Sequence, residues 1–488
     1  MSINSERFNK MNINRGISYL KRNGARKTLY KVVERIKRDE DEINYSNEVM
    51  AARPDAEELK RQRSKKFMHS YRFSILVPAY ETDPVFLREM LNSVVNQTYT
   101  NWEICLADGS ASDIVKNEVE KYTAELDADV KAKIRYQKLN RNRGISGNSN
   151  AALVMASGDY VGLLDHDDLL APNALFEIMT ALESGMERNG NVYTCRYKAV
   201  YSDEDKVNTQ VTRYFDYHKK PDFDIDLLRS NNYICHFFAV KASIAVKAGG
   251  FRSEYNGAQD HDFILRCVEQ MEPSEIYHID KVLYHWRSHQ HSTAENPDSK
   301  LYAYEAGKKA VIDHLIRMSV NAEVTDTAHL GFFRVKYSID KPNVEIIQKD
   351  NWDKITREEF DNIRADYIMV IDKKSIKPIT KDYIEELAGM LSREEVGAVG
   401  GKIYDRHGRI DSAGYSMNEN GEMIPNFRGM NGHFSGYLHR ASLQHKVDGL
   451  ATDCMMIKKS AVVFTDKPGM SKRYLVLYDP FAEFKRKG

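Results

Sequence analysis

The sequence has few of the features that mark secreted, membrane-spanning or nucleic-acid-binding proteins. Its five cysteines are scattered and show no paired spacing, which argues against a disulfide framework or a zinc site and fits a reducing compartment. Lysine plus arginine equals aspartate plus glutamate at 71 each, so no excess charge indicates nucleic acid. No apolar run approaches the roughly 18 residues that span a bilayer, and the amino terminus lacks the apolar core of a signal peptide. We therefore expect a cytoplasmic protein that binds no nucleic acid.

Residues 1–70 differ in composition from the rest of the chain. Basic side chains are concentrated between Lys21 and Arg38, and an acidic patch follows at residues 39–42. Apolar residues recur at helical spacing within the basic stretch, at Leu29, Val32, Val33 and Ile36. This pattern predicts a basic amphipathic helix. Two interpretations stay open: the helix binds the anionic inner face of the cell membrane, or it packs on its own catalytic domain.

From Tyr71 onward, strand and helix patterns alternate. Apolar segments at 73–78, 102–107, 134–138 and 160–164 predict strands, and helices are expected over 86–95 and from near Ser146. Strands separated by helices imply parallel crossover units in a sheet covered on both faces. Such sheets bind ligands at the carboxyl ends of their strands. Polar or turn residues lie at three of those ends, so we expect one crevice to collect them: Pro78, Ala79, Tyr80, Glu81, Asp108 and the run 165–168.

The run at 165–168 brings three carboxylates, Asp165, Asp167 and Asp168, to a strand end, with His166 between them. Like charges about 5 Å apart repel by roughly 3 kcal/mol at an effective dielectric of 20, so the cluster favours a cation. Hard divalent ions that keep open positions for substrate phosphates prefer such oxygen ligands. Taken alone, the run is equally typical of a solvated acidic turn.

Four segments in register resemble the successive motifs of family 2 glycosyltransferases. They are ILVPAY at 75–80, LADGS at 106–110, NRGISGNSNAA at 142–152 and LDHDD at 164–168. The resemblance implies an α/β GT-A fold with a Rossmann-like mixed sheet, a UDP- or dTDP-linked sugar donor, inversion at the anomeric carbon and Mn²⁺ or Mg²⁺ as cofactor.

The resemblance also assigns roles. Pro78, Ala79, Tyr80 and Glu81 would contact the nucleoside, and Asp108 would accept a hydrogen bond from the base. Asp165, with His166 beside it, would contact the ribose or sugar, and Asp167 would ligate the metal. Gly144, Asn148 and Asn150 begin a helix whose amino terminus suits an anion or donor sugar. A simple helix cap at Ser146 explains that last segment equally well.

Inversion by single displacement needs a base that takes the proton of the acceptor hydroxyl. The segment GAQDHDFILR at 257–266 resembles the family's Glu-Asp element, with Gln259 in place of the usual Glu. Asp260 is then the matched base and Asp262 the second catalytic candidate. Without the resemblance, these carboxylates would be read as capping and dipole effects at a helix start.

Three further stretches carry weaker expectations. Residues 201–206 and 232–237 resemble segments near the acceptor side of polysaccharide-building relatives, although a surface turn and a core strand explain them equally well. The segment LYHWRSH at 283–289 resembles the element that closes the family domain. There Arg287 would approach the diphosphate and His289 would offer a metal nitrogen, although an alternating strand also explains the spacing.

The carboxyl-terminal part resembles a second, degenerate copy. Residues 365–372 mirror 158–165, but Lys373 and Lys374 stand where the first copy has His166 and Asp167. The chain before this repeat is too short for a full nucleotide-binding half, and the base-bearing segment has no counterpart. We therefore expect a truncated GT-A-like domain, with acceptor binding, partner docking and homodimer formation left open as its use. The expected organisation is a helical segment 1–70, a catalytic domain 71–295, a helical linker 296–330 and the degenerate domain 331–488.

The sequence thus predicts a metal-dependent inverting glycosyltransferase of the hexosyl or deoxyhexosyl type. Its acceptor would be a glycan or lipid-linked saccharide in bacterial surface-polysaccharide synthesis. Two alternatives stay open, a nucleotidyltransferase and a non-catalytic scaffold that binds sugar nucleotides. The first would favour a glycine-rich phosphate loop with a basic residue after the first strand, which residues 79–81 do not offer.

Overall fold

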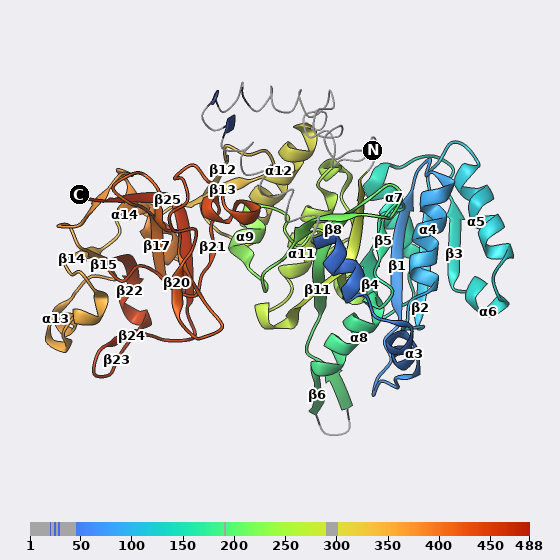
Figure 1. Cartoon of the computed structure of the whole chain (residues 1–488), viewed down its shortest axis with the longest axis horizontal. Helices are drawn as coiled ribbons and strands as arrows, with labels where there is room; N and C mark the ends of the chain where they lie inside the picture. Colours follow the sequence, from blue (N-terminus) through green and yellow to red (C-terminus); the bar gives the residue numbers. More distant parts are fainter. Residues whose placement is uncertain (1–19, 21–23, 26–27, 30–44, 190–191, 289–300) are drawn as a thin grey trace. The chain divides into compact units, whose positions relative to one another are not determined.

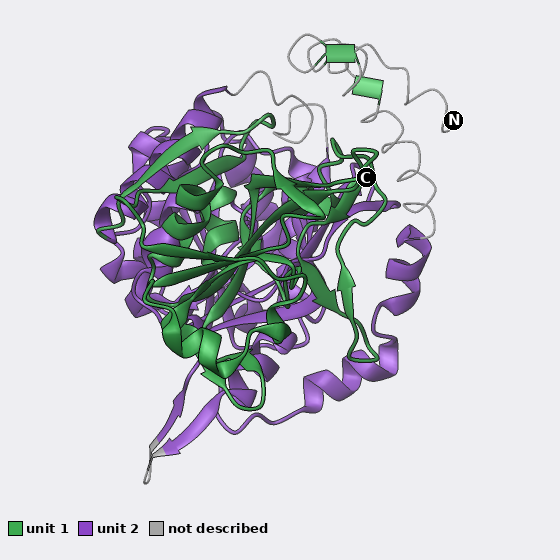
Figure 2. Ribbon diagram, turned by 90° about the vertical axis from the view of Figure 1, so that its left-hand side faces the viewer, with its two compact units in different colours: residues 1–39, 224–231, 319–488 green, residues 40–223, 232–318 purple. Residues whose placement is uncertain are grey.

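The computed structural model describes residues 20, 24, 25, 28, 29, 45–189, 192–288 and 301–488 (Figure 1). The chain divides into two compact units, coloured separately in Figure 2. Unit 2 comprises residues 40–223 and 232–318, and unit 1 comprises 1–39, 224–231 and 319–488. Most of the basic stretch at 21–38 lies outside the described residues, so the amphipathic helix expected there remains a prediction.

Unit 2 is built on one mixed sheet with the strand order β3-β2-β1-β4-β10-β8-β11-β5. The pairs β3–β2, β2–β1 and β1–β4 are parallel, β10 is antiparallel to both its neighbours, and β11 is parallel to β8. The strands are β1 (Phe73–Ala79), β2 (Trp102–Asp108), β3 (Ile134–Lys138), β4 (Tyr160–Leu163), β5 (Leu169–Leu170), β8 (Ala199–Asn208), β10 (Phe238–Lys241) and β11 (Ile276–Ser288). The expected strands and the α/β mixed sheet are confirmed.

Helices and short strands complete unit 2: α3 (Ala56–Ser64), α4 (Pro84–Val95), α5 (Ile114–Ala124), α6 (Ala128–Lys131), α7 (Gly144–Met155), α8 (Ala174–Ser184), α10 (Ala242–Lys247), α11 (Gln259–Val268), α12 (Leu301–Arg317), β6 (Met186–Asn189), β7 (Val192–Cys195) and β9 (Tyr214–His218). Helix α4 shows why these boundaries arise. The Asp83 carboxylate accepts a hydrogen bond from the Val85 amide, and Pro84 occupies the first turn, where no backbone donor is needed. Its apolar face, which includes Leu87 and Leu91, is fully buried. Because β1 and β2 are buried along their whole length, they form a rigid platform that ends at the crevice.

Unit 1 contains a second mixed sheet with the order β14-β15-β22-β17-β25-β16. Its strands are β14 (Val344–Ile347), β15 (Tyr367–Ile371), β16 (Ile376–Pro378), β17 (Val396–Tyr404), β22 (Cys454–Lys458) and β25 (Leu475–Arg486). The successive pairs are parallel, antiparallel, antiparallel, parallel and antiparallel. The first sheet has the same sequence of pairings from β1 through β4, β10, β8 and β11 to β5. Strands corresponding to β2 and β3 do not occur in this second sheet of the described residues.

Further elements of unit 1 are α9 (Ile225–Ser230), α13 (Arg357–Asn362), α14 (Tyr383–Leu391), β12 (Ala322–Asp326), β13 (Phe333–Tyr337), β18 (Ile410–Ser412), β19 (Tyr415–Met417), β20 (Met423–Pro425), β21 (His445–Lys446), β23 (Val462–Phe464) and β24 (Pro468–Met470). Helix α9 follows β9 in the chain, yet it belongs to this unit. Buried Asp226 binds Arg393, with Arg393 Nη1 2.8 Å from Asp226 Oδ1, and Tyr337 Oη donates to the same oxygen at 3.0 Å. The sequence-based domain boundaries did not include this eight-residue contribution.

Within the described part of the chain, every helix is too short or too polar to cross a membrane. Residues 45–52 and α3 are helical, so helices are present in the described part of the amino-terminal segment.

Candidate functional site

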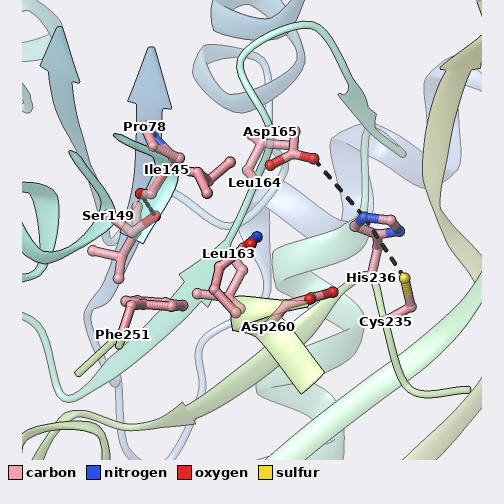
Figure 3. Close-up of a pocket in the computed structure, with 12 residues that line it drawn as sticks. Pro78, Ile145, Ser149, Leu163, Leu164, Asp165, Cys235, His236, Phe251 and Asp260 are labelled. Carbon is pink, nitrogen blue, oxygen red and sulfur yellow. Dashed lines mark hydrogen bonds and ion pairs between the residues drawn. The ribbon is translucent and has the colours of Figure 1, made fainter. Parts of the chain in front are cut away.

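A pocket opens at the carboxyl end of β4 in unit 2. Its polar wall consists of Asp165, which follows β4, Cys235 and His236, which precede β10, and Asp260 at the start of α11 (Figure 3). The remaining lining residues are Leu76, Pro78, Ile145, Ser149, Leu163, Leu164, Phe251 and Gln259. The sheet therefore brings together residues up to 184 positions apart, since Leu76 and Asp260 line the same cavity.

The acidic run after β4 is held from below by β11. Asp168 is buried, and its carboxylate accepts hydrogen bonds from Tyr284 Oη at 2.5 Å and from the Arg287 amide at 2.7 Å. The Arg287 guanidinium donates through Nε to the Asp167 carbonyl oxygen at 2.6 Å. Asp165 keeps a 45% exposed side chain, whereas that of Asp167 is 19% exposed. Asp168 thus anchors the run, and Asp165 presents its carboxylate to the pocket.

The cluster carries concentrated negative charge. Burial raises the pKa of Asp168 well above its usual value, and the charges of Asp167 and Asp165 add to the effect. Burial likewise raises the pKa of Asp165, against the opposing influence of His236. Carboxylates that resist ionisation together are stabilised by a cation.

His236 faces Asp165 across the pocket. Its Nε2 lies 3.9 Å from Asp165 Oδ2 and 3.8 Å from Cys235 Sγ, as the dashed lines in Figure 3 mark. The imidazole stacks on the Tyr284 ring at a centroid distance of 4.7 Å and an interplanar angle of 13°. Nitrogen and oxygen donor atoms of Asp165, Asp168 and His236 all lie within 4.8 Å of one another. A second group, Glu204, Cys235 and His236, has donor atoms equally close together, and its Cys235 and His236 also line the pocket.

A buried network behind His236 fixes its position. Glu204 on β8 accepts a hydrogen bond from the His236 amide at 3.1 Å, and its Oε2 lies 3.5 Å from His236 Nδ1. Lys220, whose side chain is completely buried, donates to the same carboxylate at 2.9 Å and to the Ile234 carbonyl at 2.6 Å. Although burial opposes ionisation of Glu204, Lys220 and the neighbouring histidines hold its pKa well below the usual range.

Asp260 lies in the first turn of α11 and is half-buried. Asn232 Nδ2 donates to its Oδ2 at 2.8 Å, so one oxygen is fixed from the side of β10. Asp262 faces elsewhere: it is fully buried, it is not part of the pocket lining, and it binds both Arg252 and Arg266. Because two guanidinium groups hold its carboxylate, we propose a structural role for Asp262, the second base candidate.

The residues expected to contact the nucleoside lie at the ends of β1 and β2. Tyr80 is 49% exposed, whereas Asp108 is completely buried. The Asp108 carboxylate accepts hydrogen bonds from the Ser110 amide and from Tyr136 Oη, each at 2.8 Å. The Glu81 carboxylate accepts from the Ala111 and Ser112 amides and thereby joins the two strand ends. Pro78 lines the pocket and Ala79 is buried beside it.

Helix α7 begins at Gly144, whose φ of +72° favours glycine. The Asn148 side chain accepts from the Arg143 amide at 3.2 Å, and Asn150 forms two hydrogen bonds with the Phe251 backbone. Both amides therefore stabilise the local fold, and Ile145 and Ser149 are the α7 residues that line the pocket.

The guanidinium of Arg287 does not line the pocket. Its side chain is completely buried, contacts Glu89 at 2.7 Å, and lies over the Phe86 ring. The guanidinium thus lies beneath the acidic run, and the expected diphosphate contact stays a prediction. His166 Nδ1 lies 3.0 Å from Thr82 Oγ1, and His289 lies outside the described residues.

Four residues of this site had no individual role in the sequence-based hypothesis: Asn232, Cys235, His236 and Glu204. A signal existed for Glu204, because three consecutive acidic residues, 203–205, require counter-charges when they lie in a buried strand. Its pairing with His236 depends on the β8–β10 ladder and is not visible in sequence spacing.

The chain is similar to a known family model and to several known proteins. Residues 74–247 match the family model described as Glycosyl transferase family 2. The uncharacterised protein y4gI of Sinorhizobium fredii is 30% identical over 83% of this chain and 49% of its own length. The O-antigen biosynthesis protein RfbC of Myxococcus xanthus is 31% identical over 64% of this chain and 24% of its own.

A third relative is the Escherichia coli UDP-Glc:alpha-D-GlcNAc-diphosphoundecaprenol beta-1,3-glucosyltransferase WfgD, which is 31% identical over 22% of this chain and 40% of its own length. The chain thus spans about half the length, or less, of these curated relatives.

Proposed function

Because residues 74–247 form a glycosyl transferase family 2 domain, we propose that the chain transfers a sugar from a nucleotide-diphospho-sugar to a hydroxyl group of a glycan or lipid-linked saccharide. The observation that carries this proposal is the single pocket lined by Asp165, His236 and Asp260 at the carboxyl end of β4. A carboxylate that faces a cation-binding cluster across a crevice suits displacement of a diphosphate.

Asp260 is the proposed base. Its carboxylate removes the proton of the acceptor hydroxyl while the acceptor oxygen bonds to the anomeric carbon. The bond from that carbon to the diphosphate oxygen breaks, and the nucleoside diphosphate leaves with the electron pair. Attack from the face opposite the leaving group inverts the anomeric carbon. Asn232, which donates to Asp260 Oδ2, keeps the other carboxylate oxygen directed at the acceptor.

The donor is proposed to lie along the ends of β1, β2 and β4 in a GT-A arrangement. Exposed Tyr80 offers a ring to the nucleoside. Asp108 and Glu81 hold the loops after β2 and β1 through hydrogen bonds, so they shape this end of the crevice. Asp165 contacts the ribose or sugar. A UDP- or dTDP-linked donor is proposed, and the E. coli relative that is named for UDP-Glc supports the uridine nucleotide.

A divalent cation, Mn²⁺ or Mg²⁺, fits the donor atoms at this site. The exposed Asp165 carboxylate lies within reach of an imidazole nitrogen, and the adjoining carboxylates repel one another. Asp167 is the proposed ligand within the run, with Asp165 beside it. The bound ion would supply charge stabilisation to the departing diphosphate.

The acceptor is proposed to belong to bacterial surface-polysaccharide synthesis. Two relatives support this class, since one is named for O-antigen biosynthesis and the other for a diphosphoundecaprenol-linked acceptor. A lipid-linked acceptor would bring the reaction to the inner face of the cell membrane, where the basic stretch at 21–38 would meet anionic lipid.

Unit 1 is proposed to be a degenerate GT-A-like domain. The ladders that pair Gly162 with Ala239 and Met369 with Met456 make Asp372 the counterpart of Asp165 and Asp453 the counterpart of His236. Asp453 forms an ion pair with Arg486, which also binds Asp411 at 2.9 Å. A fixed guanidinium therefore compensates the carboxylates at this strand end and competes with a metal there.

Two other functions are weaker on this evidence. A nucleotidyltransferase would need basic residues at the turn after β1, where the chain has Tyr80 and Glu81. A non-catalytic scaffold would have no use for Asp260 held at the pocket by Asn232.

A thermal-shift panel of UDP- and dTDP-sugars with Mn²⁺ tests the proposal. We expect one nucleotide class to raise the unfolding temperature of the wild type and Asp167→Ala to abolish that shift. The matched control is Lys374→Ala, which removes the counterpart residue in unit 1 and should leave the shift unchanged. Equal shifts in wild type and Asp167→Ala would overturn the assigned donor site.

A further inference from the structure

The imidazole of His236 has the surroundings of a metal ligand rather than those of a core histidine. Its Nε2 points toward Asp165 in the pocket (Figure 3). Its other nitrogen, Nδ1, lies 3.5 Å from the Glu204 carboxylate. Histidines that bind metals usually direct their second ring nitrogen to a carboxylate, which fixes both the tautomer and the orientation of the ring. His236 has this arrangement, with the Glu204 carboxylate on one side of the ring and Asp165 on the other.

The support behind His236 is rigid. Glu204 is only 6% exposed and accepts hydrogen bonds from the His236 amide and from fully buried Lys220. Lys220 also donates to the Ile234 carbonyl, so it fastens the loop that precedes β10. Tyr284 stacks on the imidazole while its hydroxyl binds Asp168. The ring is thereby positioned by the same residue that anchors the acidic run.

Two other histidines of this sheet, His278 and His285, also pair with carboxylates of β8. His278 binds Asp203 at 2.8 Å and His285 binds Asp205 at 2.6 Å, and neither lines the pocket. β8 presents an acidic partner to each of the three, and the second nitrogen of His278 lies 3.5 Å from Asp222. His236 differs in that it lines the pocket and has its remaining nitrogen beside Asp165.

We infer that His236 supplies an imidazole nitrogen to the divalent cation held by the acidic run, and that Glu204 is its positioning residue. This inference rests on the proposed function, because it adds a ligand to the same site. A nitrogen ligand shifts preference toward Mn²⁺ and Co²⁺ over Mg²⁺, which favours oxygen ligands.

Metal titrations of the full chain test the assignment. Mn²⁺ binding is measured from the resonance of the free ion, and Co²⁺ and Mg²⁺ binding by competition. We expect His236→Gln to weaken Mn²⁺ and Co²⁺ binding roughly tenfold to a hundredfold and Mg²⁺ binding far less. Glu204→Gln should show the same selectivity change to a smaller extent. His278→Gln is the matched control, since it removes a buried histidine on the same sheet, and it should leave all three affinities unchanged.

A spectroscopic measurement identifies the nitrogen directly. His289 is replaced by Gln in both samples, so that it contributes no signal. Electron spin echo modulation of bound Mn²⁺ should then show ¹⁴N coupling in His289→Gln and lose it in the double variant His236→Gln, His289→Gln. Coupling that persists in the double variant, or unchanged Mn²⁺ selectivity in His236→Gln, would overturn the inference. Those outcomes leave the proposed function intact, whereas a wild type that binds no divalent ion would contradict the proposed metal dependence itself.

Discussion

Asn232 donates a hydrogen bond from Nδ2 to Asp260 Oδ2 at 2.8 Å. The two residues come from different parts of the chain, the loop before β10 and the first turn of α11. This bond occupies one carboxylate oxygen and leaves the other for an incoming hydroxyl group. The arrangement gives Asp260 the orientation that a general base requires.

Replacing the proposed base, Asp260, should separate donor binding from transfer. We expect Asp260→Asn to keep the affinity for nucleotide sugar and to lower turnover by about a hundredfold or more, because the amide cannot accept the acceptor proton. Asn232→Ala should lower turnover less, since the base remains but loses its orientation. Transfer assays and donor titrations on both variants check this. Undiminished turnover in Asp260→Asn would move the role of base to another residue.

Asp262 should behave as a structural residue. Its carboxylate is fully buried between Arg252 and Arg266. Removing one partner of a buried ion pair typically costs about 3–5 kcal/mol, so Asp262→Asn should markedly lower the free energy of unfolding in urea. The affinity of the remaining folded protein for nucleotide sugar should stay unchanged. A stable Asp262→Asn protein with impaired transfer would instead make Asp262 part of the catalytic site.

The ion pairs of Asp262 with Arg252 and Arg266 also predict a pH dependence of stability. Burial alone would raise the pKa of Asp262, but its hydrogen bonds to the two arginines outweigh burial and lower it. Because the folded state lowers this pKa, the stabilisation is complete above the ordinary aspartate value of about 4 and is lost as the pH falls below it. Urea unfolding between pH 3 and pH 6 should therefore show a steeper acid loss for wild type than for Asp262→Asn. Parallel profiles for the two proteins would contradict this coupling.

Local patterns predicted the framework of the site, because each depends on a few neighbouring residues. The apolar strands and the polar residues that follow them predicted a site at the ends of β1, β2 and β4, and Pro78 and Asp165 of the predicted set line the pocket. Helix geometry alone indicates that Asp260 and Asp262 do not share a site, because residues two positions apart on a helix point to different faces. The direction of Arg287 could not be read from the sequence, because it depends on the β8–β11 ladder, which places the guanidinium under the acidic run. Glu204 and His236, 32 residues apart in the chain, meet only through tertiary pairing.

Helix α9 could not be assigned to unit 1 from sequence, since its partner Arg393 lies 167 residues further along the chain. Arg393→Ala would leave the buried Asp226 carboxylate without its cation, which typically costs about 3–5 kcal/mol. We expect hydrogen exchange at residues 224–231 and in β17 to accelerate strongly. The control is Arg357→Ala, because its exposed pair with Asp361 is worth about 0.5 kcal/mol or less. Equal exchange in the two variants would show that the buried pair does not hold α9.

Unit 1 carries Lys373 and Lys374 at the carboxyl end of β15, and changing them to the acidic run of unit 2 should not create a metal site there. By the register of the two sheets, Lys373 and Lys374 correspond to His166 and Asp167, so the variant Lys373→His, Lys374→Asp recreates the sequence Asp-His-Asp after β15. The counterpart of His236 is nevertheless Asp453, and Arg486 compensates both Asp453 and Asp411. A divalent ion would therefore meet a fixed guanidinium where unit 2 has the imidazole of His236. We expect the variant to bind Mn²⁺ with the stoichiometry of wild type in spin-resonance titrations. An additional Mn²⁺ ion bound per chain would mean that the two lysines alone, and not Arg486, keep this strand end free of metal.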